Sequence, residues 1–110
     1  MQEEFKEGAY VISNMIDKCL EMLETAFTSW LRSDAALAGR IPDQDDFVDA
    51  LQERAYSLVI KEVRAGKVDV EMGMMALLIS NKLEAIADIA CHIAKTVVFM
   101  IKAKQLRHES

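Results

Sequence analysis

Apolar residues recur at steps of three and four over three long stretches of the chain. That spacing gathers apolar side chains on one face of a helix, whereas alternation would indicate strands. The first stretch begins near Glu3 and fades at Gly39, ahead of Pro42. Because proline disfavours helical geometry in the preceding residue, we predict a helix over 3–37 and a break over 38–43. Its apolar positions are Ile12, Met15, Ile16, Cys19, Leu23, Ala26, Phe27, Trp30 and Leu31.

The second stretch has signals for both of its ends. Asp43 can cap a helix or lie in its first turn, and further acids crowd the positive end of the helix dipole. Gly66 stands where a left-handed C-terminal cap is expected, so we predict a helix from Asp43 to about Ala65. Its predicted buried positions are Phe47, Leu51, Ala55, Leu58, Val59 and Val63.

The third stretch follows a tight connection, Gly66-Lys67-Val68, and Asp69 is a plausible N-cap for it. We predict a helix that runs to about Arg107. Its expected seam is heptad-like and consists of Ile79, Leu83, Ile86, Ala90, Ile93, Val97 and Ile101. Additional apolar residues lie off this seam, which predicts a second partner surface and self-association.

These stretches predict an all-α fold, an antiparallel three-helix bundle with long helices. The chain has 110 residues with one proline and four glycines, which is too few turn formers for many short strands. We expect a single domain over 1–110, because this length is typical of one hydrophobic core.

Charge and cysteine content restrict the partners and the compartment. The net charge of −5 predicts no binding to nucleic acid, since an acidic field repels phosphates. The longest apolar stretch, Met72 to Ser80, is far short of a bilayer span, so we expect no membrane insertion. Cys19 and Cys91 lie inside helical patterns without a CxxC partner, which favours a reducing cytoplasm.

Two helices each carry a pair of acids one turn apart. Asp45 and Asp49 form the pair on the second helix, and Glu84 and Asp88 form the pair on the third, on a face shared with Asn81, His92 and Lys95. Such pairs repel unless they are solvated or bridged by a cation. Convergence of the two pairs would create a carboxylate metal site, with His92 as a further donor. The alternative is that both faces are wet helix surfaces.

No residue pattern indicates catalysis, so we expect that the protein is not an enzyme. The sequence has no GxGxxG or GxxxxGK[ST] loop, and no Glu-x-x-His motif of a di-iron bundle. The cysteines are interpreted as small core-side residues, because nothing that flanks them would depress a thiol pKa. His92 is interpreted as a surface residue and His108 lies in the terminal tail.

The most specific signal is the run ALLISNKLEAIADIACHIAK, residues 76–95. Its Leu-Glu-x-Ile-x-Asp core followed by a small residue and Ile-Ala resembles the last helix of a PhoU-type domain. The upstream segments Met22-Leu23-Glu24-Thr25-Ala26 and Asp45-Asp46-Phe47-Val48-Asp49-Ala50-Leu51 are similar to the first two helices of that domain. The resemblance covers nearly the whole chain and implies one three-helix repeat of a family that regulates phosphate uptake.

The resemblance also implies a metal. The family carries Glu/Asp-x-x-x-Asp motifs that bind clusters of iron or zinc, and Asp45, Asp49, Glu84 and Asp88 match that spacing. Ala87 departs from the glycine common before the last aspartate. PhoU-type proteins usually have two tandem repeats, whereas this chain has one, so we expect a homodimer in which two chains rebuild a six-helix arrangement.

Three functions follow as hypotheses. The first is a non-enzymatic regulatory module that binds a phosphate transporter or its partner sensor kinase. Related domains form the cytoplasmic tails of sodium-phosphate symporters, which is a variant of the same role. The second is a metal-binding or metal-storing helical bundle, and the third is a structural oligomerisation module.

Overall fold

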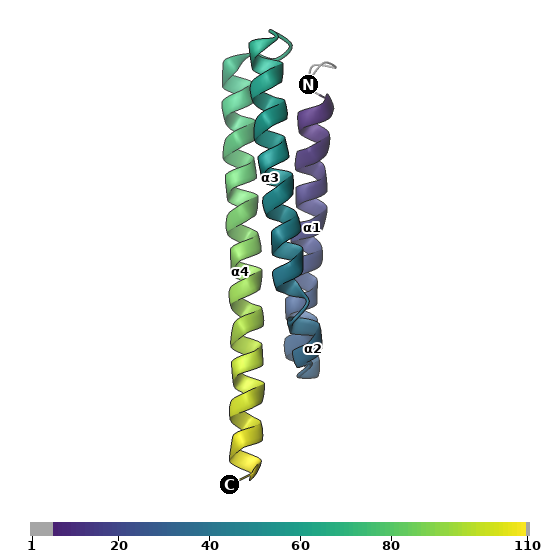
Figure 1. Ribbon diagram of the computed structural model, residues 1–110, viewed down its shortest axis with the longest axis vertical. Coiled ribbons are helices and arrows are strands. Elements are labelled where there is room, and N and C mark those ends of the chain that lie inside the picture. The colour runs from purple at the N-terminus through teal and green to yellow at the C-terminus, as the bar shows by residue number, and fades with distance from the viewer. Residues whose placement is uncertain (1–5, 110) are drawn as a thin grey trace.

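The chain forms a rod of three long helices and one short helix, which confirms the predicted all-α bundle (Figure 1). The computed structural model describes residues 6–109 and measures 66 × 17 × 16 Å. Consecutive long helices are antiparallel, so the first and the last run in the same direction. None of the described helices combines the length and apolarity that a bilayer crossing requires. The helices are α1 (Lys6–Arg32), α2 (Ala35–Ala38), α3 (Ile41–Arg64) and α4 (Val70–Glu109).

The first predicted helix ends earlier than the sequence indicated. The expectation of one helix over 3–37 is wrong, because α1 stops at Arg32 and Ser33 adopts a left-handed conformation with φ 50°. Asp34 then begins α2, and its side chain accepts a hydrogen bond from the backbone N–H of Leu37 at 3.0 Å. The predicted start at Glu3 lies outside the described residues.

The α3 helix begins at Ile41, two residues before Asp43. Asp43 therefore lies in the first turn, which is one of its two predicted placements, and does not cap the helix. Pro42 occupies the same turn. Proline fits there because the first N–H groups of a helix have no partner within it, and the fixed φ of proline suits helical geometry. The proline therefore opens α3 instead of only ending the preceding segment.

The predicted connection between α3 and α4 is confirmed in detail. Gly66 adopts φ 73°, and its backbone N–H donates to the carbonyl of Val63 at 3.0 Å. The carboxylate of Asp69 accepts from the N–H of Met72 at 2.8 Å, as an N-cap does. This tight turn sends α4 back along α3, and α4 continues to Glu109, past the predicted end at Arg107.

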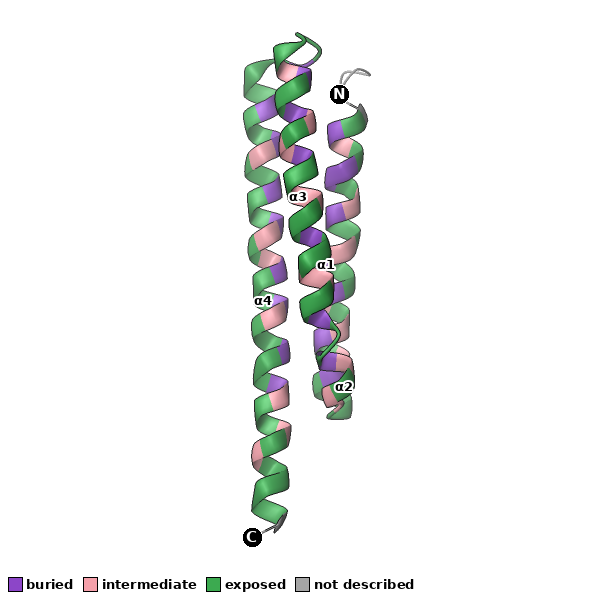
Figure 2. Cartoon of the chain, viewed as in Figure 1, coloured by how far each residue is buried: buried purple, intermediate pink, exposed green. Residues whose placement is uncertain are grey.

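The buried stripe of α4 consists mainly of small residues (Figure 2). The predicted seam is therefore only partly correct: Leu83, Ala90 and Val97 are buried, but Ile79 is 41% exposed and Ile93 is 36% exposed. Small side chains let α1 and α3 approach α4 closely, so the bulky residues beside them turn outward. The small buried residues of α4 are Ala76, Ser80, Ala87, Ala90 and Ala94.

Several bulky residues that were predicted to be buried on α1 and α3 are exposed. Phe27, Trp30 and Leu31 on α1 and Phe47 on α3 are each more than half exposed, and Ile16 is 41% exposed. The stripe that α1 buries lies to one side of the predicted one. It consists of Val11, Ile12, Met15, Cys19, Met22, Ala26 and Ser29.

A buried carboxylate joins α3 to the start of α1. Glu62 is 5% exposed, and its Oε1 accepts a hydrogen bond from the backbone N–H of Gly8 at 3.0 Å. That N–H belongs to the first turn of α1, where helical N–H groups lack partners and the dipole favours negative charge. This contact fixes the position of α1 along the axis of α3.

We predict that Gly66→Ala lowers the free energy of unfolding by about 1 kcal/mol, because a left-handed φ is unfavourable for any residue with a Cβ. A Cβ at Gly66 would touch nothing within 4 Å, so the loss of stability would come from the backbone conformation alone. Urea denaturation measures it. Gly39→Ala is the matched control, since Gly39 has φ −67°, and it should not destabilise. An equal loss in both variants would contradict the prediction.

Candidate metal centre

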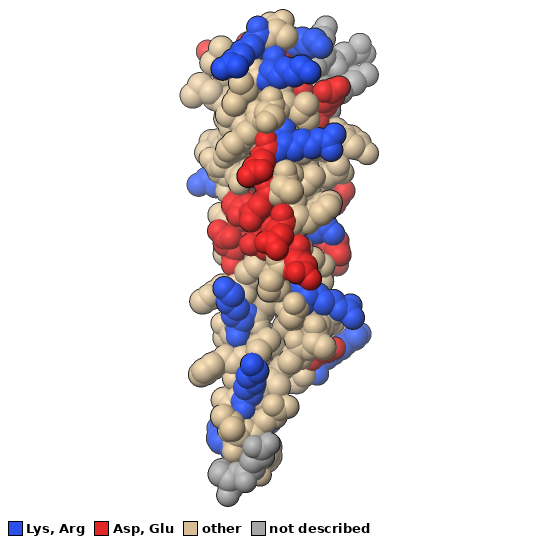
Figure 3. All heavy atoms as spheres, in the orientation of Figure 1, with Lys and Arg blue, Asp and Glu red and all other residues tan. Residues whose placement is uncertain are grey.

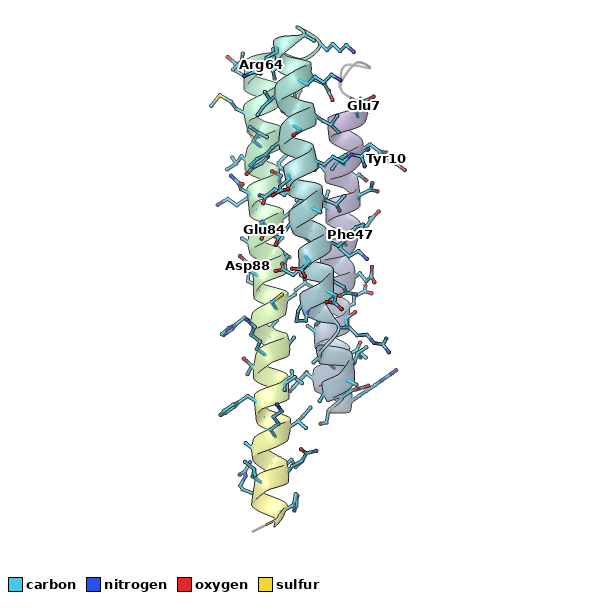
Figure 4. The ribbon with its side chains drawn as sticks, viewed as in Figure 1. Glu7, Tyr10, Phe47, Arg64, Glu84 and Asp88 are labelled. Atoms are coloured by element: carbon cyan, nitrogen blue, oxygen red, sulfur yellow. The ribbon has the colours of Figure 1, made fainter. Side chains whose placement is uncertain are left out.

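The two acid pairs face each other across the groove between α3 and α4. Because these helices are antiparallel, the first turns of α3 lie beside the middle of α4. Figure 4 shows Glu84 and Asp88 projecting from α4 toward α3. In Figure 3 the acidic side chains gather near the middle of this face, with basic side chains toward both ends of the molecule. The convergence that the sequence left open therefore exists in the structure.

Three of the four predicted residues lie within reach of a single ion. Asp45, Asp49 and Glu84 each place one carboxylate oxygen within 4.8 Å of the other two. Asp88 is not one of these three residues, but its charge raises the pKa of both Asp45 and Glu84. We call these four residues the acid cluster.

The carboxylates of the acid cluster repel one another. Burial and the adjacent Asp49 raise the pKa of Glu84 to about 7. The pKa of Asp45 is also raised, first by burial and then by the charges of Asp49 and Asp88. Ionising both groups at neutral pH is therefore unfavourable unless a proton or a cation compensates the charge.

Two carboxylate oxygens of the acid cluster have no hydrogen-bond partner. Asp45 Oδ1 and Glu84 Oε2 are shielded from solvent and accept no hydrogen bond of normal geometry from a described residue. Their closest polar neighbours are the Cys91 thiol, which partly offsets the rise in the pKa of Asp45, and the Asp49 carboxylate, which adds to the rise in that of Glu84. A shielded oxygen without a donor costs free energy, and a bound cation would relieve that cost. The geometry, the orphaned oxygens and the all-carboxylate donor set thus fit a metal ion.

A pocket of about 390 Å³ opens beside the acid cluster. Cys91 lines it, and burial, followed by the charge of Asp45, raises the pKa of this thiol to about 11. The sequence analysis interpreted Cys91 as a core-side residue and did not place it at this pocket. Its position could have been inferred, because Cys91 follows Asp88 by three residues and so lies on the same helix face. His92 is exposed at the same pocket, as expected of a surface residue.

Asn81 lies on the predicted polar face but serves a structural purpose. Its Oδ1 accepts a hydrogen bond from Gln52 Nε2 at 3.0 Å and another from the hydroxyl of Tyr56. Both donors belong to α3, so this network holds α3 against α4 next to the acid cluster. It limits how far the carboxylates can move apart.

We predict that Glu84→Gln stabilises the metal-free protein above pH 7. The folded-state pKa of Glu84 is about 7 and the ordinary value is 4.5, so the folded protein retains a proton that the unfolded chain loses. Stability therefore falls as pH rises through this interval, and the glutamine variant avoids that loss. Thermal unfolding in chelator between pH 4.5 and 8 should show an advantage that grows up to about pH 7.

The matched control is Glu24→Gln, which removes one charge from an exposed position on α1. It should show no comparable growth of stability with pH. A Glu84→Gln variant no more stable than wild type at pH 8 would refute the electrostatic description of the cluster.

Comparison with known proteins agrees with the resemblance seen in the sequence. No solved structure matches the chain. A curated relative, the phosphate-specific transport system accessory protein PhoU homolog 1 of Thermotoga maritima, is 24% identical over 96 residues. The match covers 87% of this chain but 41% of the relative, so the chain spans about two fifths of the length of that protein. The family model described as the PhoU domain matches residues 12–97, which include the whole acid cluster, and the chain belongs to this family.

Proposed function

We propose that this protein is a non-enzymatic regulatory module of phosphate transport and phosphate signalling. The observation that carries the proposal is the PhoU-domain match over residues 12–97. The curated relative is named as an accessory protein of a phosphate-specific transport system, which supports the same role here. The module would act in the cytoplasm by contact with a phosphate transporter or a sensor kinase.

The described side chains support a role in contacts rather than in catalysis. The buried hydroxyls of Ser29 and Ser80 donate to backbone carbonyls in their own helices, at 2.7 and 2.8 Å. Burial raises the pKa values of the Cys19 and Cys91 thiols, which lowers their nucleophilic fraction at neutral pH. The serine and cysteine groups that the fold encloses are thus poor nucleophiles.

We further propose that the acid cluster binds iron or zinc through Asp45, Asp49, Glu84 and Asp88. The repulsion among these carboxylates and the orphaned oxygens of Asp45 and Glu84 support a cation at this place. Carboxylates alone also suit magnesium, calcium or manganese. The choice of iron or zinc rests on the family resemblance. A bound ion would join the start of α3 to the middle of α4.

The chain is proposed to be one domain over 1–110 that works as a homodimer. Its match covers 41% of the relative, which leaves room in that longer protein for a second three-helix repeat. Two copies of the present chain would supply the same number of helices. A cytoplasmic tail domain of a sodium-phosphate symporter is the variant of this proposal in which the chain is joined to its transporter.

The acid cluster favours one alternative, a metal-binding or metal-storing bundle. Storage requires several ions per chain, whereas the trio of Asp45, Asp49 and Glu84 describes a site for a single ion. Stoichiometry therefore separates the two functions. A purely structural oligomerisation module is the remaining alternative, and it requires neither metal nor a transport partner.

We predict that protein purified without a tag or chelators contains iron or zinc, and that the double variant Asp49→Ala, Asp88→Ala loses it. Each substitution removes one carboxylate from a different helix of the cluster. Elemental analysis by mass spectrometry measures the metal per chain. About one ion per chain fits the single site that Asp45, Asp49 and Glu84 describe, whereas several ions per chain would favour storage.

The matched control is the double variant Asp17→Ala, Glu24→Ala, which removes the same charge from α1. It should retain the metal of the wild type. Metal-free wild type, or equal loss in both double variants, would show that the acid cluster is not a metal site.

We predict that deletion of the gene from the native host changes phosphate uptake under phosphate-replete conditions, and that expression of this chain restores the original rate. Uptake of labelled phosphate measures the effect. The acid-cluster double variant, expressed at the same level, shows whether the metal site is needed for regulation. Uptake unaffected by the deletion would refute the regulatory role even if the protein binds metal.

A further inference from the structure

A stripe of bulky apolar side chains runs exposed along α4. These residues follow alternating steps of three and four, and they are 36% to 55% exposed. The stripe continues through the half-buried Ile86, and Lys82 and Thr96 occupy its two polar positions. The exposed members are Met72, Met75, Ile79, Ile89, Ile93 and Met100.

A second exposed stripe runs along α1. Its members are 41% to 61% exposed, and each of them is large and apolar. Soluble monomers rarely expose contiguous apolar patches of this extent, so the stripe marks a contact surface. The residues are Ile16, Leu20, Phe27 and Leu31.

Both stripes lie on the side of the rod away from α3. On α1, Lys18 lies over the Phe47 ring of α3, 5.1 Å from its centroid. Leu20 follows Lys18 by two residues, so it points about 200° around α1, away from α3. On α4, Glu84 lies beside Asp49 of α3. Ile86 follows Glu84 by two residues, so it also points about 200° around its helix, away from α3.

The two stripes form one surface, because α1 and α4 run parallel and pack side by side. Trp30 of α1 and Met100 of α4 line the same pocket, of about 380 Å³, at one end of it. We call this surface the α1/α4 face.

The chain exposes more surface than a monomer of its mass normally does. Its accessible surface is 7511 Å² at 12.4 kDa. A compact monomer of that mass exposes about 6,100 Å². The excess is larger than the roughly 800 Å² that each partner buries in a stable protein interface. The rod shape of 66 × 17 × 16 Å accounts for such an excess by itself, so the comparison shows only that the surface is large enough for an interface.

We propose that a second copy of this chain covers the α1/α4 face, packed antiparallel about a two-fold axis near Ile86. This inference rests on the homodimer proposed above and assigns its interface. The stripe is symmetric about Ile86: Met72 and Met100 each lie fourteen residues away, and Ile79 and Ile93 each lie seven away. Antiparallel pairing thus places Met72 opposite Met100 and Ile79 opposite Ile93, whereas each polar position of the stripe meets an apolar one.

Charge selects the antiparallel orientation over the parallel one. A parallel pair in register would place Lys82 opposite the same lysine of the second copy, inside an apolar interface. The antiparallel pair places Lys82 at the level of Ala90 and beside Ile89, about 12 Å along the helices from the second lysine. It also places Glu71, in the first turn of α4, near Lys104 of the second copy, which lines the same pocket as Trp30 and Met100, so that opposite charges meet at both ends.

The length of α4 supports the same arrangement. In Figure 1 the C-terminal part of α4 extends alone past α2 and the end of α1. A parallel partner would leave this extension in contact only with its own counterpart. An antiparallel partner lays it against the opposite end of the second copy, where α3 turns into α4, and so covers it.

We expect Ile79→Asp to weaken dimerisation at least tenfold, because Ile79 is 41% exposed on the stripe and the two-fold axis places the new charge opposite the apolar Ile93 twice. Sedimentation equilibrium measures the dissociation constant. Ile60→Asp is the matched control: Ile60 is 43% exposed on α3, off the α1/α4 face, and should leave dimerisation unchanged. Circular dichroism checks that both variants fold. A wild type that stays monomeric at 100 µM, or equal effects of both substitutions, would overturn the proposal and leave the face to a different protein.

The orientation is tested with charge reversal at low salt. Lys104→Glu should weaken an antiparallel dimer at least threefold, and adding Glu71→Lys should recover the loss; Lys102→Glu, on the opposite side of α4, is the matched control. In a parallel dimer each side chain meets its own counterpart, so Lys104→Glu would exchange one like-charge pair for another and Glu71→Lys would recover nothing, which would overturn the orientation. Metal content of Ile79→Asp keeps this inference separate from the proposed metal site: a monomeric variant that retains its metal shows that the interface and the metal site are independent.

Discussion

The small side chains that α4 buries determine how the rest of the molecule is arranged. Alanine and serine at positions such as Ala76, Ser80 and Ala87 leave little bulk between α4 and its two neighbours, so the helices pack closely. A core this narrow has no room for the isoleucines and methionines of the same helix. They remain outside, and the same closeness brings the carboxylates of α3 and α4 together across their groove.

Close packing therefore produces two different surfaces on one rod. On one side, Asp45 and Glu84 are held where desolvation and mutual repulsion raise both pKa values. Such an arrangement costs stability and persists only because the surrounding contacts fix it, among them the network of Gln52, Tyr56 and Asn81. A cation at this place would convert an unfavourable contact between α3 and α4 into a favourable one. Occupancy by the proposed ion would then be linked to the stability of the bundle.

The sequence was sufficient for the features that local rules decide. Gly66 and Asp69 could be placed because a left-handed cap and an N-cap depend on a few neighbouring residues. Helical spacing and a short antiparallel connection made a meeting of the acid pairs possible, but they did not decide between that meeting and two separate solvated faces. The break at Ser33 could not be foreseen, because periodicity continues through it and only the Asp34 cap marks it. The exposure of Ile79 and Ile93 was also missed, since α4 is apolar around much of its circumference and periodicity does not choose among its faces.

The helix α4 belongs to both surfaces, which constrains how one could influence the other. Glu84 and Ile86 are two residues apart in a single continuous helix, yet they face opposite sides of it. An ion that draws α3 and α4 together would act on the orientation of this helix as a rigid element, because a packed core shifts between discrete arrangements rather than deforming gradually. Any such rotation of α4 would move the whole apolar stripe with it. The route from the acid cluster to the α1/α4 face is thus the body of α4 itself, and it needs no chain of intervening side chains.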